Sequence, residues 1–265
     1  MKLFNTVFIF LFTSLTLPLK AGEEFCGVRN KAFLAGETIT YKVYYTLAGV
    51  YVAAGEAVFN TTIEHVNNRP VYHITGDGKT YSFYDNFFRV RDKYETFIDT
   101  ATMQPLKFLR NVDEGGYKIY ENVTFNKTGS TAITTKGVFK VPSCVQDVMS
   151  SIYYARNIDF SKLKVNDKIP FYMFLDNQVY EIYVRYLGKD IVKTKYGRFR
   201  AIKFKPLLIK GTIFEGGEKM TVWVSDDGNH IPLRVESPIT VGKIQVEMMD
   251  FRNRRYPMSS LLDVN

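Results

Sequence analysis

The chain has 265 residues, of which 46% are hydrophobic and 15% aromatic, and its formal net charge is +8 at pH 7. This composition excludes a disordered chain, and the length suits one large all-β domain or two small ones. Basic residues are spread along the sequence instead of forming the stripe that nucleic-acid proteins carry, so we expect no nucleic-acid partner.

The first 21 residues predict a secretory signal peptide. Lys2 precedes an apolar run over residues 3–19, and the small residue Ala21 follows. The run is shorter than the roughly 20 apolar residues of a membrane span. We therefore expect cleavage near Ala21, which removes Lys2 and Lys20, lowers the net charge from +8 to +6 and leaves a chain that does not span a membrane. The expected location is the periplasm or the cell surface of a Gram-negative bacterium.

Two cysteines, Cys26 and Cys144, are present. Export to an oxidising compartment favours one disulfide between them. Closing so long a loop stabilises the fold by about 4–5 kcal/mol in the chain-entropy description. The alternative is two free buried thiols.

Segments with alternating apolar and polar residues follow the signal and predict β-strands. The expected strands are residues 38–45, 51–63, 69–75, 80–99, 105–112, 117–125, 130–135, 169–188, 197–207, 219–225, 231–237 and 242–251. Asp176 and Asn177, inside the segment 169–188, predict a turn that divides it in two. Gly55 predicts a bulge or a close backbone approach.

Short polar and glycine-rich sequences predict the turns between strands. They are residues 114–116, 176–177, 215–217 and 226–229. The sequence GDGK at residues 76–79 lacks the spacing of a phosphate-binding loop, so we interpret it as a further hairpin turn.

One segment, residues 142–157, has helical spacing. Val145, Val148 and Met149 begin an apolar stripe after Ser143, which is a potential N-cap. We expect this helix to pack on a sheet.

About fourteen strands are too many for one flat sheet. The predicted fold is mainly β: a strongly curved antiparallel sheet that forms an open or partial barrel, with the mid-chain helix packed on it. Residues 22–265 would form a single β-rich domain, and the alternative is a division near Ser161 into two smaller β domains.

The sequence WVSDDGNHIPLRVES places Asp226, Asp227 and His230 close together. Flanking alternation favours a hairpin loop, since general acids and bases need a pocket that shifts their pKa. The alternative is an envelope-polymer hydrolase that uses these groups with Glu56. No catalytic residue is assigned, and His65 and His73 lack metal-ligand spacing, so neither a metal nor a cofactor is expected.

Aromatic residues are abundant in several expected strands. A sheet lined with aromatic side chains can hold an apolar or sugar-like ligand, and the candidate binding residues are Tyr81, Phe83, Tyr153 and Trp223. The alternative is an aromatic core filled by its own side chains.

Three stretches in this order resemble a bacterial envelope family of unknown function, DUF3108: FLAGETITYKVYYTLAGVYVAAGEAVF, DVMSSIYYARNIDF and VWVSDDGNHIPLRVES. The resemblance extends over nearly all of the chain after the signal. It implies an exported β-rich protein of Bacteroides-like bacteria with a shape akin to half-barrel lipoprotein carriers. It transfers no catalytic residues, and a likeness of fold does not license a function.

The favoured expectation is an exported binding or accessory protein of the cell envelope whose concave sheet holds an apolar lipid, a lipoprotein segment or a glycan. The hydrolase is one alternative. The other is a structural partner in an envelope complex that pairs through an exposed sheet edge.

Overall fold

The computed structural model describes residues 27–47, 50–210, 216–239 and 241–264. The predicted signal peptide, residues 1–21, and Cys26 lie outside these residues. Signal cleavage and the pairing of Cys26 with Cys144 therefore stay predictions.

Fifteen strands form one antiparallel sheet, which confirms the mainly β fold. They are β1 (Thr38–Leu47), β2 (Val50–Val66), β3 (Arg69–Thr80), β4 (Arg91–Asp99), β5 (Pro105–Glu114), β6 (Tyr117–Asn126), β7 (Thr131–Thr134), β8 (Gly137–Lys140), β9 (Lys168–Leu175), β10 (Gln178–Lys193), β11 (Gly197–Pro206), β12 (Thr221–Ser225), β13 (Pro232–Pro238), β14 (Lys243–Arg252) and β15 (Leu261–Val264). The short strands β8 and β15 were not expected from the sequence.

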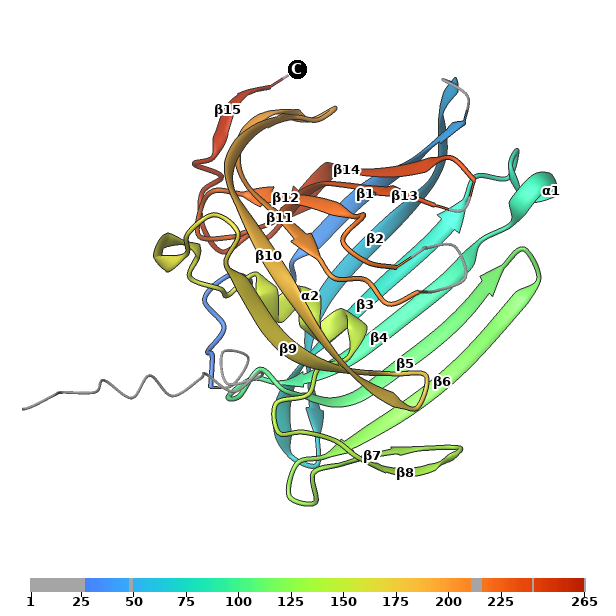
Figure 1. Ribbon diagram of the computed structural model, residues 1–265, viewed down its shortest axis with the longest axis vertical. Helices are drawn as coiled ribbons and strands as arrows, with labels where there is room; N and C mark the ends of the chain where they lie inside the picture. Colours follow the sequence, from blue (N-terminus) through green and yellow to red (C-terminus); the bar gives the residue numbers. More distant parts are fainter. Residues whose placement is uncertain (1–26, 48–49, 211–215, 240, 265) are drawn as a thin grey trace, which may run out of the picture.

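Fourteen of these strands form two meanders, β1 to β8 and β9 to β14, which join where β1 pairs with β14, and β15 pairs with β11 (Figure 1). The predicted division near Ser161 falls between the two meanders in the chain, but their strands belong to the same sheet. Assignment of residues 22–265 to a single domain stays a prediction.

The predicted mid-chain helix is present as α2 (Val148–Ala155), and a short 3-10 helix over Phe160–Lys162 follows it. Its N-cap is Asp147, so the expectation of Ser143 was wrong. Asp147 Oδ1 accepts a hydrogen bond from Ser150 N at 2.7 Å, and Ser150 Oγ accepts one from Asp147 N at 2.8 Å. The helix cannot begin earlier because the backbone of Gln146 is hydrogen-bonded to β9. Its N–H donates to the carbonyl of Tyr172, and its carbonyl accepts from the N–H of Phe174.

Residues 80–99 do not form the single long strand that their alternation predicted. They contain the end of β3, the four-residue helix α1 (Asp85–Phe88) and then β4. The side chain of Asp85 accepts hydrogen bonds from Thr80 Oγ1 at 2.6 Å and from Arg91 Nη2 at 2.5 Å. These bonds close the connection between β3 and β4 and interrupt the strand.

The GDGK sequence is not a turn, because residues 76–79 lie within β3. A Cβ on Gly76 would lie 3.1 Å from Met149 Cε of α2 and 3.2 Å from Phe59 Cε1. Glycine at this position thus makes room for helix α2 against the sheet. The turn at Asp176 and Asn177 is confirmed, with φ values of 51° and 63°.

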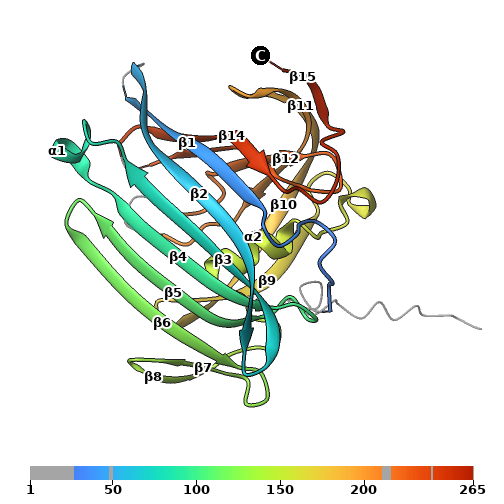
Figure 2. The same cartoon turned by 180° about the vertical axis from the view of Figure 1, so that it is seen from behind.

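Helix α2 lies on one face of the sheet, in contact with β4 and β9 (Figures 1 and 2). Its buried residues Met149, Tyr153 and Tyr154 belong to the main hydrophobic core. The bulge predicted at Gly55 is present. Val43 of β1 pairs with Gly55 of β2, and the next residue, Tyr44, pairs with Ala53.

The sheet is not closed into a barrel, because its outermost strands β8 and β9 share no backbone ladder. Side chains nevertheless connect its two ends. Thr134 Oγ1 donates to Asn177 Oδ1 at 2.7 Å, and Arg110 pairs with Asp176 in the turn between β9 and β10. In the same turn, the backbone N–H of Asp176 donates a hydrogen bond to Glu121 Oε1 of β6 at 3.1 Å.

Candidate functional site

The DDGN loop between β12 and β13 is a turn, as the sequence favoured. The carboxylate of Asp227 accepts hydrogen bonds from Ser225 Oγ at 3.0 Å, Asn229 N at 3.0 Å and Ser260 Oγ at 2.6 Å. Asp226 forms an ion pair with Lys189 at 2.9 Å. Asp227 thus connects the loop to the C-terminal segment, and Asp226 connects it to β10.

His230 contributes to the packing of α2 on this loop. Its Nδ1 lies 2.7 Å from the carbonyl oxygen of Arg156, the C-cap of α2, and its ring meets Phe160 edge-on. Burial lowers the pKa of His230, which favours the neutral ring with Nδ1 as donor. The groups of the hydrolase hypothesis take separate partners, since Glu56 pairs with Lys79 on β3.

Two of the four predicted binding residues are packed. Tyr153 is buried, with its ring 4.9 Å from that of Phe33. Trp223 is partly buried and donates Nε1–H to Asp190 at 3.0 Å, with Lys203 over its ring at 5.1 Å. These contacts hold strands together and leave neither side chain displayed in an open site.

The other two predicted residues lie at the same end of the sheet. Tyr81 follows β3, and burial raises its pKa, with nearby Glu56 raising it further and Lys79 lowering it. Tyr81 follows Lys79 by two residues but is not among the residues that line the hollow described below. Phe83 is 72% exposed in the connection between β3 and α1.

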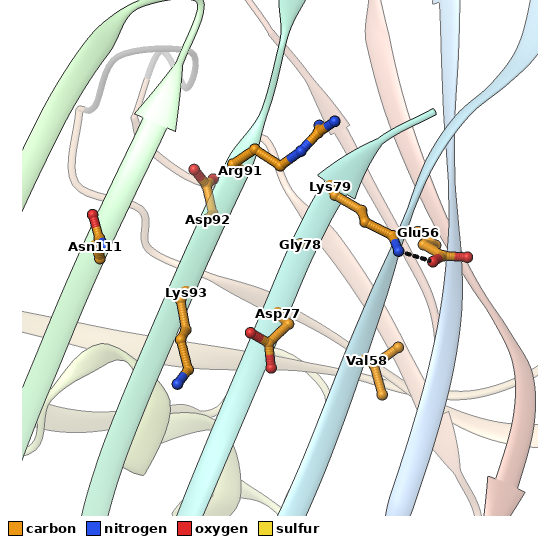
Figure 3. Close-up of a pocket in the computed structure, with 9 residues that line it drawn as sticks. All are labelled: Glu56, Val58, Asp77, Gly78, Lys79, Arg91, Asp92, Lys93 and Asn111. Carbon is orange, nitrogen blue, oxygen red and sulfur yellow. Dashed lines mark ion pairs between the residues drawn. The ribbon is translucent and has the colours of Figure 1, made fainter. Parts of the chain in front are cut away.

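A hollow of about 340 Å³ lies across β2 to β5 (Figure 3). It is lined by Glu56, Val58, Asp77, Gly78, Lys79, Arg91, Asp92, Lys93 and Asn111. Gly76 faces α2, so the neighbouring side chains of Asp77 and Lys79, respectively one and three residues further along β3, face the opposite side of the sheet. The hollow is thus on the face away from α2.

Five charged side chains face the hollow, two acidic and three basic: Glu56, Asp77, Lys79, Arg91 and Lys93. Asp92 is opposite Gly78 in the β3–β4 pair, so its side chain points to the α2 face of the sheet. Lys79 forms an ion pair with Glu56 across its wall at 3.0 Å, as Figure 3 shows. Arg91 is directed to Asp85 at 2.5 Å and Lys93 to Glu95 at 3.2 Å. The arrangement offers closely spaced hydrogen-bond donors and acceptors to a polar molecule.

On the opposite face of β4, next to Glu114, Asp92 has a carboxyl proton that can be lost near neutral pH. Burial raises the pKa of Asp92 to about 6, and the neighbouring carboxylate of Glu114 raises it as well. Asp113 N donates to Asp92 Oδ1 at 3.2 Å, which opposes this rise. Two carboxylates this close favour a shared proton.

Below the hollow, His73 lies between two glutamates on the same face. Its Nδ1 is 2.6 Å from Glu64 Oε1 and its Nε2 is 2.9 Å from Glu95 Oε2, and its ring stacks on Phe97. Burial acts to raise the pKa of Glu95, but hydrogen bonds from Lys93 and His73 lower it. Within the described ranges, no group of three or more His, Cys, Asp or Glu residues could hold a metal ion.

Sequence reasoning missed most of the hollow. The signal was present: residues 77 and 79, and residues 91 and 93, are charged at the two-residue spacing that places them on one face of a strand. Interpreting residues 76–79 as a turn removed β3 from this region and hid the pattern.

A family model described as a protein of unknown function, DUF3108, matches residues 40–249. No curated protein matches the chain by sequence. No helix in the described part of the chain is long and apolar enough to cross a membrane.

Solved structures resemble the chain at low sequence identity. A β-barrel-like protein of the family DUF1849 from Brucella abortus has a TM-score of 0.57 at 10% identity, over 85% of this chain and 99% of its own. A protein described as exported, with a YmcC-like fold, from Bacteroides fragilis has a TM-score of 0.35 at 13% identity, over 85% and 99%. A protein described as a lipoprotein from Parabacteroides distasonis has a TM-score of 0.38 at 12% identity, over 84% and 100%. The first of these supports the fold alone.

Proposed function

The chain belongs to the DUF3108 family of proteins of unknown function, and we propose that it is an exported envelope protein that binds a hydroxyl-rich glycan in the charged hollow. The observation that carries this proposal is the gathering of five charged side chains of both signs, together with Asn111, around one hollow. Convergent donors and acceptors of this kind suit hydroxyl groups, which both donate and accept hydrogen bonds.

The chemistry of the hollow favours a glycan over an apolar lipid or lipoprotein segment. Burying five charged groups under an acyl chain would remove their water without replacing its hydrogen bonds. The sequence led us to expect a ligand on the face toward α2. That face is covered by α2, whose side chains Met149 and Tyr153 belong to the hydrophobic core.

We further infer that the sheet curves into a half barrel around α2. The contacts of α2 with both β4 and β9, and the side-chain bonds between the two ends of the sheet, support this shape. The apolar segment at residues 3–19 supports export to the periplasm or cell surface.

Export predicts a specific covalent form of the protein. Intact mass spectrometry of the protein recovered from the cell envelope will give a chain that begins near residue 22 and is two hydrogens lighter than its reduced form, because Cys26 and Cys144 are bridged. Recovery of the chain from Met1 in the cytoplasm, or alkylation of both thiols without a reductant, would contradict the prediction.

Binding at the hollow is tested with a glycan array of bacterial surface polysaccharide and peptidoglycan fragments. The glycan that binds the wild type is then titrated against Asp77→Ala, which removes an acceptor from the hollow. We expect at least about tenfold weaker binding, since a hydrogen bond to a charged group contributes roughly 1.5–3 kcal/mol.

Asp250→Ala is the matched control, because Asp250 is a half-exposed partner of Arg252 on β14 and does not line the hollow. It should bind like the wild type. Equal affinities of the wild type and Asp77→Ala would remove the hollow as the site. A lipid retained in native mass spectrometry, with no glycan bound on the array, would favour the apolar carrier instead.

A further inference from the structure

Exposed apolar side chains gather at the end of the sheet that carries α1. Because the strands form antiparallel meanders, the end of β1, the start of β2, the β3–β4 and β5–β6 turns, the end of β13 and the start of β14 all lie at this end (Figures 1 and 2). Their exposed large apolar residues, which we call the aromatic rim, are Val50, Tyr51, Phe83, Phe87, Phe88, Tyr117 and Val241. Among the described residues, all three exposed phenylalanines belong to the rim.

The structure holds the phenylalanines outward. Phe83 and Phe87 are 72% and 79% exposed, yet the loop that carries them is fixed by the bonds of Asp85 to Thr80 and Arg91. Their rings also contact each other, with centroids 6.3 Å apart. Rigid display of large apolar groups on a surface is typical of a contact with an apolar phase or partner.

Two turns of the rim touch and form one surface. A Cβ on Gly115, in the β5–β6 turn, would lie 2.6 Å from the ring of Phe88. Glycine therefore allows α1 to pack against this turn, which places Tyr117 near the phenylalanines.

The charged groups beside the phenylalanines present positive charge outward. Arg89 and Lys118 both pair with Asp113, at 3.4 Å and 3.9 Å. The two cations are 54% and 75% exposed, whereas the carboxylate between them is only 18% exposed. Two outward cations over one recessed carboxylate complement an anionic surface.

We propose that the aromatic rim docks on a lipid bilayer with anionic headgroups, with its phenylalanines inserted at the interface. Aromatic rings with neighbouring basic side chains are the combination found at membrane interfaces. The rim consists of the projecting ends of separate turns, a shape suited to a broad, soft surface. This docking does not depend on a ligand in the hollow, which lies on the flank of the sheet.

The test is flotation of the protein with vesicles of phosphatidylethanolamine and phosphatidylglycerol. The protein is purified as the cells process it, and all variants carry the same N-terminus, so differences between them report the rim. Phe83→Ser with Phe87→Ser should lower the vesicle partition coefficient at least about tenfold, because two apolar rings no longer leave water. Lys118→Glu should lower it on these vesicles and leave binding to phosphatidylcholine vesicles unchanged.

Val165→Ser with Ile191→Ser is the control, since both residues are 59% exposed and lie outside the rim. It should bind like the wild type. Absence of wild-type binding, or an equal loss in the control, would overturn the proposal. So would a monomer–dimer equilibrium that Phe83→Ser with Phe87→Ser abolishes while vesicle binding is unaffected, because the rim would then be covered by a second copy.

Discussion

Replacing Arg156 by methionine will lower the free energy of unfolding by about 3–5 kcal/mol, as expected when one partner of a buried ion pair is removed. The guanidinium of Arg156 donates to both carboxylate oxygens of Glu37, at 2.6 Å and 2.8 Å, and to the carbonyl of Asn229 at 3.1 Å. The side chains of Arg156 and Glu37 are only 2% and 1% exposed. The variant would leave the carboxylate of Glu37 buried without a counter-charge, and urea denaturation measures the loss.

A double variant separates the lost charge pair from lost packing. Adding Glu37→Gln to Arg156→Met should restore part of the stability, because no unpaired charge then remains inside. Arg252→Met is the matched exposed case, since Arg252 pairs with Asp250 at the surface, and it should cost less than about 1 kcal/mol. Equal losses for Arg156→Met and Arg252→Met would show that the buried pair does not hold the fold.

The contacts of Arg156 show why the role of the DDGNH sequence could not be decided from local spacing alone. One side chain at the end of α2 connects the N-terminal segment through Glu37 to the β12–β13 turn through Asn229. Glu37 and Asn229 are far apart in sequence, so no local spacing predicts this connection. The polar residues of the turn could be found from the sequence, whereas their partners come from the tertiary fold.

Alternation predicted the strands well where one face is buried and the other polar, as in β1 and β5. It failed where a glycine or a side-chain bond overrode it. Gly76 was taken for a turn although it makes room for Met149, and Asp85 interrupts an apparently continuous strand. The hollow could not be predicted for a further reason. Its walls come from several strands, and a single sequence does not show which strands pair.

The pH dependence of stability should change when Asp147 is replaced by asparagine. Asp147 is fully buried, and burial raises its pKa from 3.8 to about 6 despite hydrogen bonds from Ser150 and Thr96. The folded state therefore holds a proton that the unfolded chain has released between about pH 4 and pH 6. Stability from this group is fully present below pH 4 and is lost as the pH rises through 6, by about 3 kcal/mol in all.

Asparagine carries no proton to lose, and its side-chain oxygen can still accept from Ser150 N at the helix N-cap. Urea denaturation of both proteins from pH 4 to pH 7 should thus show the variant gaining about 2.5 kcal/mol relative to the wild type, because part of the total is already lost at pH 4. Groups that titrate in both proteins, such as Asp92, cancel in this difference. Asp147→Ala provides the control: it also loses the pH dependence but is less stable than asparagine at every pH, because it removes the cap. Parallel stability curves for the wild type and Asp147→Asn would mean that Asp147 is already ionised at pH 4 in the folded protein, with its charge stabilised by the bonds from Thr96 and the first turn of α2.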